Sequence, residues 1–322
     1  MISVLMATYN KARFLDNTLA GYQNQSCKDF ELVIVDDGST DETRNVVKKY
    51  SDKINIKYCP QEKIGISRAR SATLENASND YLVITDDDRI PCVDFIKTHK
   101  QLLEKGEKKV YIGKEALILS YYHPEIKFKY CDEYRLYTRF PELLSGEEKQ
   151  LFCGEDVLNH WDKVLEDYFL SDYTESYILE LVKVYGEDLT DFHLGWSRAY
   201  GGNMSFDRSF CTQEVYYDHN YKGYGIEDTD FSYQLFKQGF HFSFSSEAIN
   251  YHQEHKRRFQ ENREAFLNFQ YFCKKYPDPI VKIMKMDWEG KTDLFKGNDF
   301  YNFLIRNKAE FKENIIDILN EK

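Results

Sequence analysis

The chain has 322 residues, of which 42% are hydrophobic and 30% are charged, a composition typical of a folded globular protein and not of a disordered one. Its net charge of −11 argues against nucleic-acid binding, because that binding depends on Lys and Arg side chains at the phosphates. The seven cysteines form no C-x-x-C pair, so the sequence predicts neither a disulfide framework nor a zinc site.

The same features favour a cytoplasmic protein with no transmembrane segment. The first residues lack the basic region of a signal peptide, and no run of about 18 apolar residues is present. Peripheral contact with the inner face of a membrane stays open, because such contact needs no long apolar segment.

The first hundred residues alternate short apolar runs, typical of buried strands, with segments that carry apolar residues at helical spacing. This alternation predicts a mostly parallel sheet that is covered by helices on both faces. The expected strands span residues 2–7, 30–35, 54–58 and 81–85, and the expected helices span residues 12–25, 41–50 and 66–77.

Polar clusters stand directly after three of these strands. Because the carboxyl ends of parallel strands meet at the same edge of a sheet, where ligands bind, we expect the three clusters to lie together. The clusters consist of Thr8, Tyr9 and Asn10, of Asp36 and Asp37, and of Asp86, Asp87 and Asp88.

The second half of the chain is less regular. Residues 114–195 are rich in Tyr, Glu and Asp, with candidate helices near 155–170 and 174–186, and they form either an insertion that shapes a pocket or a plain packing layer. Residues 256–275 predict an amphipathic helix that the following prolines end, and charged helical sequence continues to residue 322.

Three consecutive carboxylates end the expected strand at 81–85. Like charges this close repel one another, so a divalent cation that prefers oxygen ligands is the natural compensation. The alternative is a solvated acidic turn. Neither Asp36 nor Asp86 begins an EF-hand calcium loop, and the glycine motifs of dinucleotide-binding and P-loop proteins are absent, which argues against a dehydrogenase.

Three segments of the first 115 residues, V-L-M-A-T-Y-N-K, E-L-V-I-V-D-D-G-S-T-D and Y-L-V-I-T-D-D-D-R-I-P, resemble the family 2 glycosyltransferases with the GT-A fold. They come in the order of that family and at its spacing. The later segments G-G-N-M-S-F and G-I-E-D-T-D-F are similar to the C-terminal part of β-1,4-galactosyltransferases, polypeptide N-acetylgalactosaminyltransferases and chondroitin-type polymerases.

The resemblance implies an α/β protein with a Rossmann-like, mostly parallel central sheet flanked by helices. It implies a GT-A catalytic domain over residues 1–253, followed by a helical C-terminal extension over residues 254–322. The catalytic domain would comprise a nucleotide-binding half (1–113), an acceptor-shaping insertion (114–195) and an acceptor and catalytic half (196–253).

The resemblance also implies a nucleotide-sugar site. Asp37 would accept a hydrogen bond from uracil, Asp36 would lie on the ribose side, and Arg70 would lie near the base or the phosphates. Gly201 and Gly202 would let the backbone approach the donor sugar closely. The residues expected at this site are Thr8, Tyr9, Asn10, Asp36, Asp37, Arg70, Asp86, Asp87, Gly201 and Gly202.

A metal site for Mn²⁺ or Mg²⁺ follows from the same resemblance. Asp86 and Asp88 would be the D-x-D pair that touches ribose and metal, with Asp88 as the first choice for a direct ligand. His252, in Y-H-Q-E-H, would be the late histidine ligand, and His255 is the competing alternative nearby.

Catalysis is expected at Glu227 and Asp228. An inverting transfer needs a base that takes the proton of the acceptor, and by resemblance that base is Asp228, while Glu227 binds acceptor hydroxyls. The alternative is that Asp228 or Thr229 simply starts a helix. Trp196 either stacks on the acceptor or is buried, and Tyr224 stands where the galactosyltransferases have a Trp-rich loop, in a stacking role.

The predicted activity is metal-dependent transfer of a sugar from a UDP-sugar to a glycan, a lipid-linked sugar or a peptide. The absence of Q-x-x-R-W favours a single transfer over processive synthesis. The alternatives are a non-catalytic sugar-binding protein on the same scaffold and a nucleotidyltransferase, which would need a Gly-rich phosphate loop. The C-terminal helices either pair with a second chain or cap this one.

Overall fold

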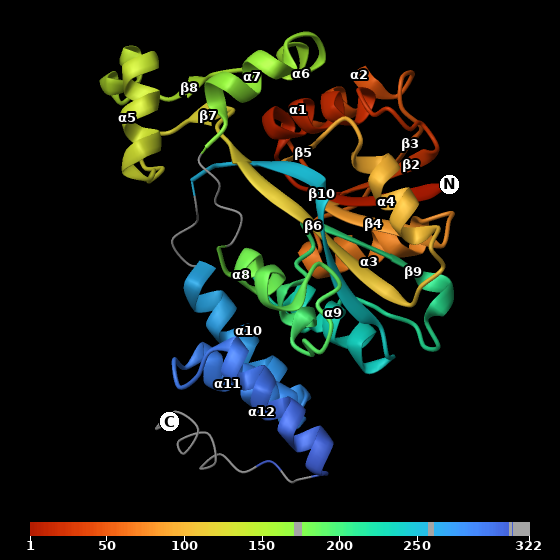
Figure 1. Ribbon diagram of the computed structural model, residues 1–322. Coiled ribbons are helices and arrows are strands. Elements are labelled where there is room, and N and C mark those ends of the chain that lie inside the picture. Colours follow the sequence, from red (N-terminus) through yellow and green to blue (C-terminus); the bar gives the residue numbers. More distant parts are fainter. Residues whose placement is uncertain (171–175, 257–260, 309–310, 312–322) are drawn as a thin grey trace.

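The central feature of the computed structural model, which describes residues 1–170, 176–256, 261–308 and 311, is an eight-stranded sheet with helices on both faces (Figure 1). The strands are β1 Ile2–Thr8, β2 Phe30–Asp36, β3 Ile56–Pro60, β4 Tyr81–Asp86, β5 Arg89–Pro91, β6 Lys109–Ile118, β9 Asn203–Asp207 and β10 His241–Gln253, with β7 Tyr121–Tyr122 and β8 Lys149–Gln150 in a separate pair. The helices are α1 Ala12–Gln23, α2 Thr43–Tyr50, α3 Ile66–Asn76, α4 Phe95–Leu103, α5 Tyr130–Arg139, η1 Pro141–Ser145, α6 Gly154–Asn159, α7 Trp161–Tyr168, α8 Ser176–Tyr185, η2 Gly195–Arg198, η3 Arg208–Phe210, α9 Glu227–Lys237, α10 Glu261–Lys275, α11 Pro279–Trp288 and α12 Leu294–Asn307.

The first half of the sheet is the predicted parallel unit. Strands β3, β2, β1 and β4 lie side by side in that order, and all pair in parallel. Strands β1 and β2 are almost wholly buried, as expected for apolar runs that are covered by helices on both faces. The mixed α/β architecture of the prediction is therefore confirmed.

The second half of the sheet is mixed in direction and curls. Strand β9 pairs antiparallel with both β4 and β6, while β10 runs parallel to β6. The register between β10 and β6 is broken between Ser245 and Ile249, and the far end of β10 then pairs antiparallel with β5. Only Asp87 and Asp88 separate β4 from β5, so this acidic turn lies where the sheet curls back on itself.

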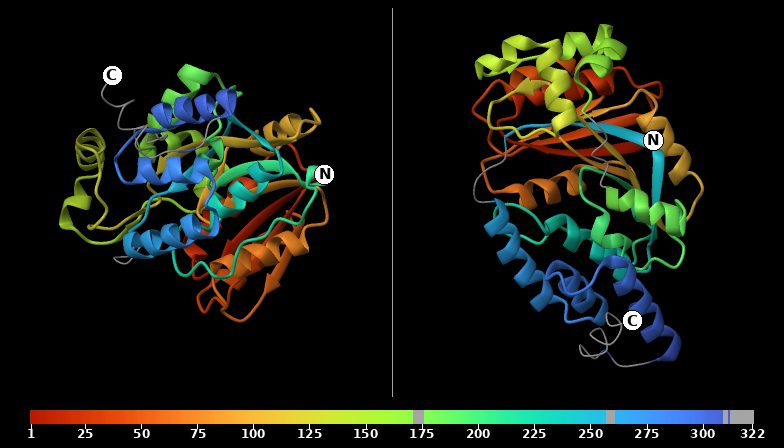
Figure 2. Two further views of the ribbon diagram at one scale, coloured as in Figure 1. Left: turned by 90° about the horizontal axis from the view of Figure 1, so that it is seen from below. Right: turned by 60° about the vertical axis from the view of Figure 1, so that its left-hand side comes forward.

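Helices on the two faces bury separate apolar clusters. One cluster joins the sheet residues Leu5 and Phe206 to Trp196 and to side chains of α9–α12, such as Phe272. The other packs Val4 and its neighbours under α1, α2, α4 and α7. Figures 1 and 2 place the C-terminal helices and the segment that carries α5 at opposite ends of the molecule.

Several boundaries differ from the prediction. The expected strand at 54–58 begins at Ile56, because the Ile54 backbone N–H still donates to Tyr50 at the end of α2. The expected helix near 155–170 is broken at His160 into α6 and α7. The starts of the helices expected at 174–186 and 256–275 fall partly on 171–175 and 257–260, outside the described residues, and α8 and α10 begin after them.

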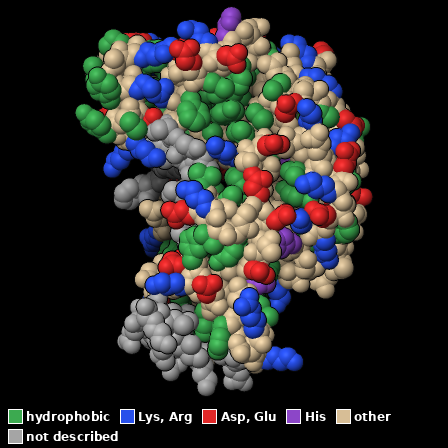
Figure 3. All heavy atoms as spheres, viewed as in Figure 1, with side chains coloured by type: hydrophobic (Ala, Val, Ile, Leu, Met, Phe, Trp, Pro, Cys, Tyr) green, Lys and Arg blue, Asp and Glu red, His purple; other side chains and the backbone are tan. Residues whose placement is uncertain are grey.

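The outer surface carries charges of both signs, as Figure 3 shows for one face. Apolar side chains gather over α5 and η1, where Tyr130, Tyr134 and Leu144 are 83%, 66% and 67% exposed. Within the described part of the chain, no helix has both the length and the apolar character needed to cross a bilayer.

Candidate active site

The three polar clusters meet at one edge of the sheet, as predicted. Thr8 is the register partner of Asp36 across β1 and β2, and Ala7 is the partner of Asp86 across β1 and β4. The carboxyl ends of β2 and β4 therefore lie on either side of the carboxyl end of β1, each one strand spacing away.

The second cluster fixes the loops around it. The Asp37 carboxylate accepts hydrogen bonds from the Gln61 side chain and the Gly65 backbone N–H, both at 2.9 Å, and Asp36 accepts one from the Ser39 backbone at 2.8 Å. A carboxylate offers about four acceptor positions. Both side chains thus shape the loops, and their contacts with uracil and ribose stay predictions.

The first cluster lies beside the same loops. Asn10 has a φ of 52° and its side-chain oxygen accepts a hydrogen bond from the Thr40 backbone at 2.8 Å. The Tyr9 ring is partly exposed, with the Lys63 ammonium 3.8 Å from its centre. Thr8 is buried. An exposed aromatic ring and a nearby cation at this edge suit a flat base and an anionic group.

The third cluster ends in a group of potential metal ligands. Asp88, His252 and His255 each offer a ligand atom, and these atoms all lie within 4.8 Å of one another. Nε2 of His252 is 3.7 Å from Oδ1 of Asp88, and Nε2 of His255 is 3.1 Å from Oδ2. The Lys11 ammonium also lies here, 3.0 Å from Asp88 and 2.9 Å from His255.

The antiparallel pairing of β5 with β10 explains why these residues meet. His252 is the register partner of Arg89, and the Gln253 backbone N–H donates to the Asp88 carbonyl at 2.9 Å. Asp88 and His252, which are 164 positions apart in sequence, are therefore brought together by the pairing of β5 with the end of β10.

Neighbouring charges set the protonation of this cluster. Burial would raise the pKa of Asp88, but the charges of Lys11, His252 and His255 hold that pKa well below its usual value. Burial and the charge of Asp88 raise the pKa of the adjacent Asp87 to about 7. The ionised carboxylate of Asp88 is thus prepared for a cation, and its donor set of one oxygen and two nitrogens fits a divalent metal.

Asp86 belongs to a second acidic cluster on the other side of the turn. The Arg70 guanidinium lies 2.8 Å from Asp86, 2.8 Å from Glu227 and 2.6 Å from Asp228. Arg89 lies 3.5 Å from the other oxygen of Asp86. Among the described residues, Asp86 is outside the group of potential metal ligands, and its two carboxylate oxygens face guanidinium groups; its contact with ribose or metal stays a prediction.

The acids of this second cluster hold protons more tightly than usual. Burial and the charge of Asp228 raise the pKa of Glu227 to about 7. Burial also raises the pKa of Asp228, although Arg70 opposes the shift. The Oε2 atom of Glu227 is buried and has no hydrogen-bond partner in the described parts of the chain. A carboxylate with a free, buried oxygen is suited to a polar ligand.

Both glycines of the G-G-N segment lie against charged side chains. A Cβ on Gly201 would be 2.5 Å from Oδ1 of Asp228, and a Cβ on Gly202 would be 2.5 Å from Arg89 and 2.7 Å from Glu115. With any larger residue at these positions, the Asp228 carboxylate and the Arg89 guanidinium would have to move away from the sheet edge.

Helix α10 holds the loop that leads to the acidic pair. The Asn268 side-chain nitrogen donates to the carbonyls of Lys222, Tyr224 and Gly225 at 2.9–3.2 Å, and Glu264 accepts a hydrogen bond from the Tyr224 backbone at 2.8 Å. Tyr224 itself is 43% exposed. Its ring is therefore accessible beside the site, and its stacking role stays a prediction.

Of the two alternatives for Trp196, stacking on the acceptor or burial, the structure shows burial. Trp196 is 0% exposed, and its ring packs 4.6 Å from Tyr233 and 5.9 Å from Phe272, measured between ring centres. It belongs to the apolar cluster between the sheet and the C-terminal helices. A ring enclosed on all sides cannot stack on a sugar.

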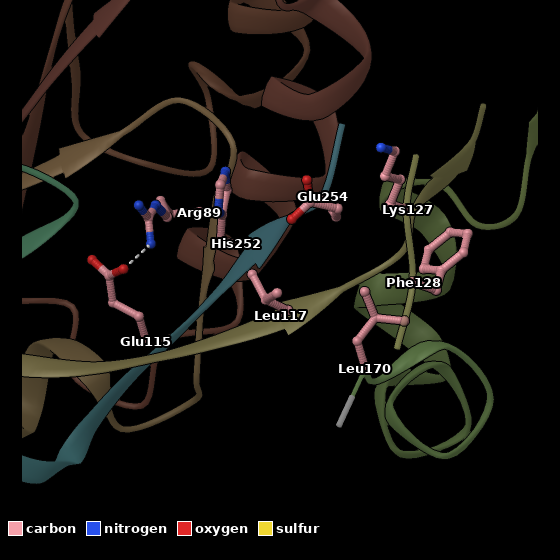
Figure 4. Close-up of a pocket in the computed structure, with 8 residues that line it drawn as sticks. All are labelled: Arg89, Glu115, Leu117, Lys127, Phe128, Leu170, His252 and Glu254. Atoms are coloured by element: carbon pink, nitrogen blue, oxygen red, sulfur yellow. Dashed lines mark ion pairs between the residues drawn. The ribbon is translucent and has the colours of Figure 1, made fainter. Parts of the chain in front are cut away.

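A cavity of about 380 Å³ lies beside the metal-ligand group (Figure 4). The sequence did not identify its residues, with the exception of His252, because β5, β6, β10 and the 114–195 segment bring them together only in the fold. Its lining residues are Arg89, Glu115, Leu117, Lys127, Phe128, Leu170, His252 and Glu254.

Two family models match the chain. The model described as glycosyl transferase family 2 matches residues 3–119, and the model described as the N-terminal domain of galactosyltransferase matches residues 184–257. The chondroitin synthase of Escherichia coli is 26% identical over 79% of this chain and 34% of that protein. The chain thus spans about a third of the length of this relative.

Two solved structures have a similar fold. TarS of S. aureus in complex with UDP-GlcNAc is 15% identical, with a TM-score of 0.52 over 98% of this chain and 69% of that one. The mannosyltransferase PcManGT of Pyrobaculum calidifontis in complex with GDP-Man and Mn²⁺ is 16% identical, with a TM-score of 0.54 over 99% of this chain and 78% of that one. At these identities the likeness is one of fold.

Proposed function

Because the chain is a family 2 glycosyltransferase with the GT-A fold, we propose that it transfers a hexose or an N-acetylhexosamine from a UDP-sugar to a hydroxyl group of an acceptor. The acceptor is a glycan, a lipid-linked sugar or a peptide. The observation that carries this proposal is the meeting of two acidic clusters at one sheet edge, around Asp88 and around Asp228. The UDP-GlcNAc complex of TarS supports a UDP-sugar as the donor.

The donor nucleotide lies along the carboxyl ends of β1, β2 and β4 in this proposal. The nucleotide contacts are assigned to the residues that the family resemblance implies and that share this edge. Uracil pairs with Asp37, and the ribose lies towards Asp36 and Asp86. The polar and aromatic groups of Thr8, Tyr9, Asn10 and Asp87 surround the nucleotide, and Gly201 and Gly202 lie beside the donor sugar.

The ion of this site is Mn²⁺ rather than Mg²⁺. Mg²⁺ takes oxygen ligands, whereas the group here offers two imidazole nitrogens, from His252 and His255, with one carboxylate, from Asp88. The Mn²⁺ complex of PcManGT supports the same choice. When bound, such an ion supplies positive charge to the diphosphate leaving group.

Asp228 is the base in this proposal. The acceptor oxygen forms a bond to the anomeric carbon, the bond from that carbon to the diphosphate breaks, and its electron pair leaves with UDP. The acceptor proton passes to the Asp228 carboxylate, which Arg70 and the start of α9 hold in place. Attack opposite to the leaving group inverts the anomeric centre.

Glu227 is the acceptor contact in this proposal. Its Oε1 atom is held by Arg70 at 2.8 Å, while its buried Oε2 atom has no partner among the described residues. A hydroxyl that donates to Oε2 would satisfy this atom and place the acceptor next to the base. Tyr224, exposed on the preceding loop, is the second acceptor contact.

The test is a panel of UDP-glucose, UDP-galactose, UDP-GlcNAc and UDP-GalNAc, each with Mn²⁺ and with Mg²⁺. Release of UDP and the shift of the thermal unfolding midpoint are measured, because a ligand that binds the native state raises its stability. We expect at least one UDP-sugar to give both effects, more strongly with Mn²⁺. GDP-mannose is the control that shows whether the protein selects uracil over another nucleobase.

The two readouts separate the competing functions. Binding of UDP without any turnover would favour a non-catalytic sugar-nucleotide-binding protein. If none of the four donors binds or releases UDP in the presence of Mn²⁺, the proposed activity is wrong.

A further inference from the structure

We propose that the 380 Å³ cavity beside His252 binds the acceptor, and that the acceptor presents a neutral pyranose ring there. The inference rests on the proposed transferase function and specifies its acceptor class. Figure 4 shows the cavity lined from three directions, by β6, by the end of β10, and by the 114–195 segment that carries Phe128 and Leu170.

The cavity is continuous with both acidic clusters through shared residues. His252 belongs to the cavity and to the metal-ligand group. Arg89 belongs to the cavity and lies 3.5 Å from Asp86. Arg89 and Glu115 also lie against Gly202, the direct neighbour of the glycine that contacts Asp228. A ligand in the cavity therefore adjoins the metal-ligand group through His252 and faces the second cluster through Arg89, the ion-pair partner of Asp86.

The lining has an apolar side and a polar side. Leu117, Phe128 and Leu170 form the apolar side, and Glu115 and Glu254 are among the polar residues. A pyranose ring has the same division, with C–H groups on its faces and hydroxyl groups around its rim. Aromatic and aliphatic side chains with a few placed polar groups are the usual lining of such sites.

Two opposite charges in the cavity have no partner. Within the described ranges of the chain, the side chains of Lys127 and Glu254 form no hydrogen bond and no ion pair, while Arg89 and Glu115 are 2.7 Å apart and neutralise one another. The unpaired groups sum to zero charge. Hydroxyl groups can accept from the ammonium and donate to the carboxylate, so this balance favours a neutral sugar over a uronic acid.

The origin of the lining separates acceptor from donor. Arg89, Glu115 and His252 lie in the two segments that match family models, residues 3–119 and 184–257. Lys127, Phe128 and Leu170 lie between those segments. The cavity therefore joins the common transfer site to a part of the chain outside either model, which is where selectivity for a particular acceptor is expected.

The experiment measures binding and transfer separately. Ligand-observed NMR in metal-free buffer tests the methyl β-glycosides of glucose, galactose, N-acetylglucosamine, N-acetylgalactosamine and glucuronic acid against the full chain. Glu254→Gln, which lies just after β10, and Phe128→Ala are compared with Glu247→Gln, on an exposed part of β10, and with Tyr134→Ala, 66% exposed on α5. UDP affinity with Mn²⁺ is measured for all variants.

We expect at least one neutral glycoside to bind, and both cavity variants to weaken its binding about tenfold, the change that 1.4 kcal/mol produces. The control variants and all UDP affinities should be unchanged. Glu254→Gln keeps the size of the side chain, so it reports on the cavity even if Phe128→Ala fails to fold.

Several results would overturn the inference. They are preferential binding of the glucuronide, equal effects of cavity and control variants, no glycoside binding at all, and a loss of UDP affinity in the cavity variants. Failure of the proposed function looks different, because UDP and the UDP-sugars then do not bind, while a glycoside signal lost in Glu254→Gln still identifies a sugar site.

Discussion

The two acidic clusters that flank the turn after β4 shift the pKa values of their carboxylates in opposite directions. On one side, Asp88 lies among Lys11, His252 and His255, and these groups hold its pKa well below the usual value. On the other side, Glu227 and Asp228 share Arg70 with Asp86, and burial raises both of their pKa values.

The difference follows from the ratio of cations to carboxylates in each buried cluster. Lys11 and the two histidines around Asp88 keep its carboxylate ionised, as a metal ligand must be. Around Arg70, burial raises the pKa values of Glu227 and Asp228, which makes both carboxylates stronger proton acceptors than exposed ones. In the proposed function, one sheet edge thus supplies a metal ligand and a base from the same residue type.

The largest expected effect is that of Asp228→Asn, which removes the proposed base and keeps the shape of the side chain. We expect the rate of sugar transfer to fall by about 10²–10⁴, the usual contribution of general base catalysis. Affinity for UDP with Mn²⁺ should be unchanged, because Asp228 contacts Arg70 and not the metal-ligand group. A parallel loss of UDP affinity would place Asp228 in the donor site instead.

Asp88→Asn tests the other cluster. We expect a loss of about 10²–10³ in rate, comparable to the removal of one preorganised electrostatic contact, together with weaker Mn²⁺ binding. Asp87→Asn is the matched control, since Asp87 is buried next to Asp88 but is outside the described metal-ligand group. Mn²⁺ titrations of both variants make the comparison, and equal losses of Mn²⁺ affinity would contradict the assignment of Asp88.

Arg70→Gln is expected to change the pH dependence of the reaction. Arg70 opposes the burial that raises the pKa values of Glu227 and Asp228, so its removal raises both further. A base acts only when ionised, so the acidic limb of the pH–rate profile should move to higher pH. Arg70→Lys keeps the charge and should move it less. An unshifted limb in Arg70→Gln would exclude this cluster as the base.

The same shift gives a stability prediction. The native state binds more protons at Glu227 than the unfolded chain does between pH 4.5 and about 7, so this group makes the free energy of unfolding fall as pH rises through that window. Urea denaturation across the window should show a steeper fall for Arg70→Gln than for the unchanged protein. A fall that Glu227→Gln leaves intact would point to other groups.

The sequence predicted the sheet half from β1 to β4 because β1, β2 and β4 are continuous apolar runs that each end in a polar cluster. Periodicity also indicated α8 and α10. It did not predict the break at His160 between α6 and α7, because both helices continue the same apolar pattern, although His160 has a non-helical φ of −139°.

The sequence indicated those parts of the candidate site whose residues are consecutive along the chain. The acidic triplet and the pair Glu227–Asp228 were found this way. The choice between the two alternatives for Trp196 and the cavity contact of Glu254 could not be predicted, because both depend on which face of the sheet a distant helix or strand covers. Lys11 directly follows the first polar cluster in the sequence. Its ion pair with Asp88 could not be predicted, because it depends on how the sheet curls where β5 pairs with β10.

Lys11 gives the smallest and most specific test of the comparison between the clusters. Its ammonium lies 3.0 Å from Asp88 and 2.9 Å from His255, so it occupies contacts that a metal ion would also use. An ion that binds must compete with this contact, and a partly exposed ion pair of this kind is worth about 1 kcal/mol or less.

Lys11→Met should therefore tighten binding of Mn²⁺ alone by at most about fivefold, whereas Lys11→Arg, which keeps the charge, should not. The measurement is direct Mn²⁺ titration without nucleotide, so it does not depend on any role of Lys11 with phosphates. Weaker Mn²⁺ binding in Lys11→Met would mean that the lysine supports the ion site rather than competing for it. The positive charge of Lys11 would then stay beside Asp88 when the ion is bound. The charge difference between the two clusters would in that case be larger with the ion than without it.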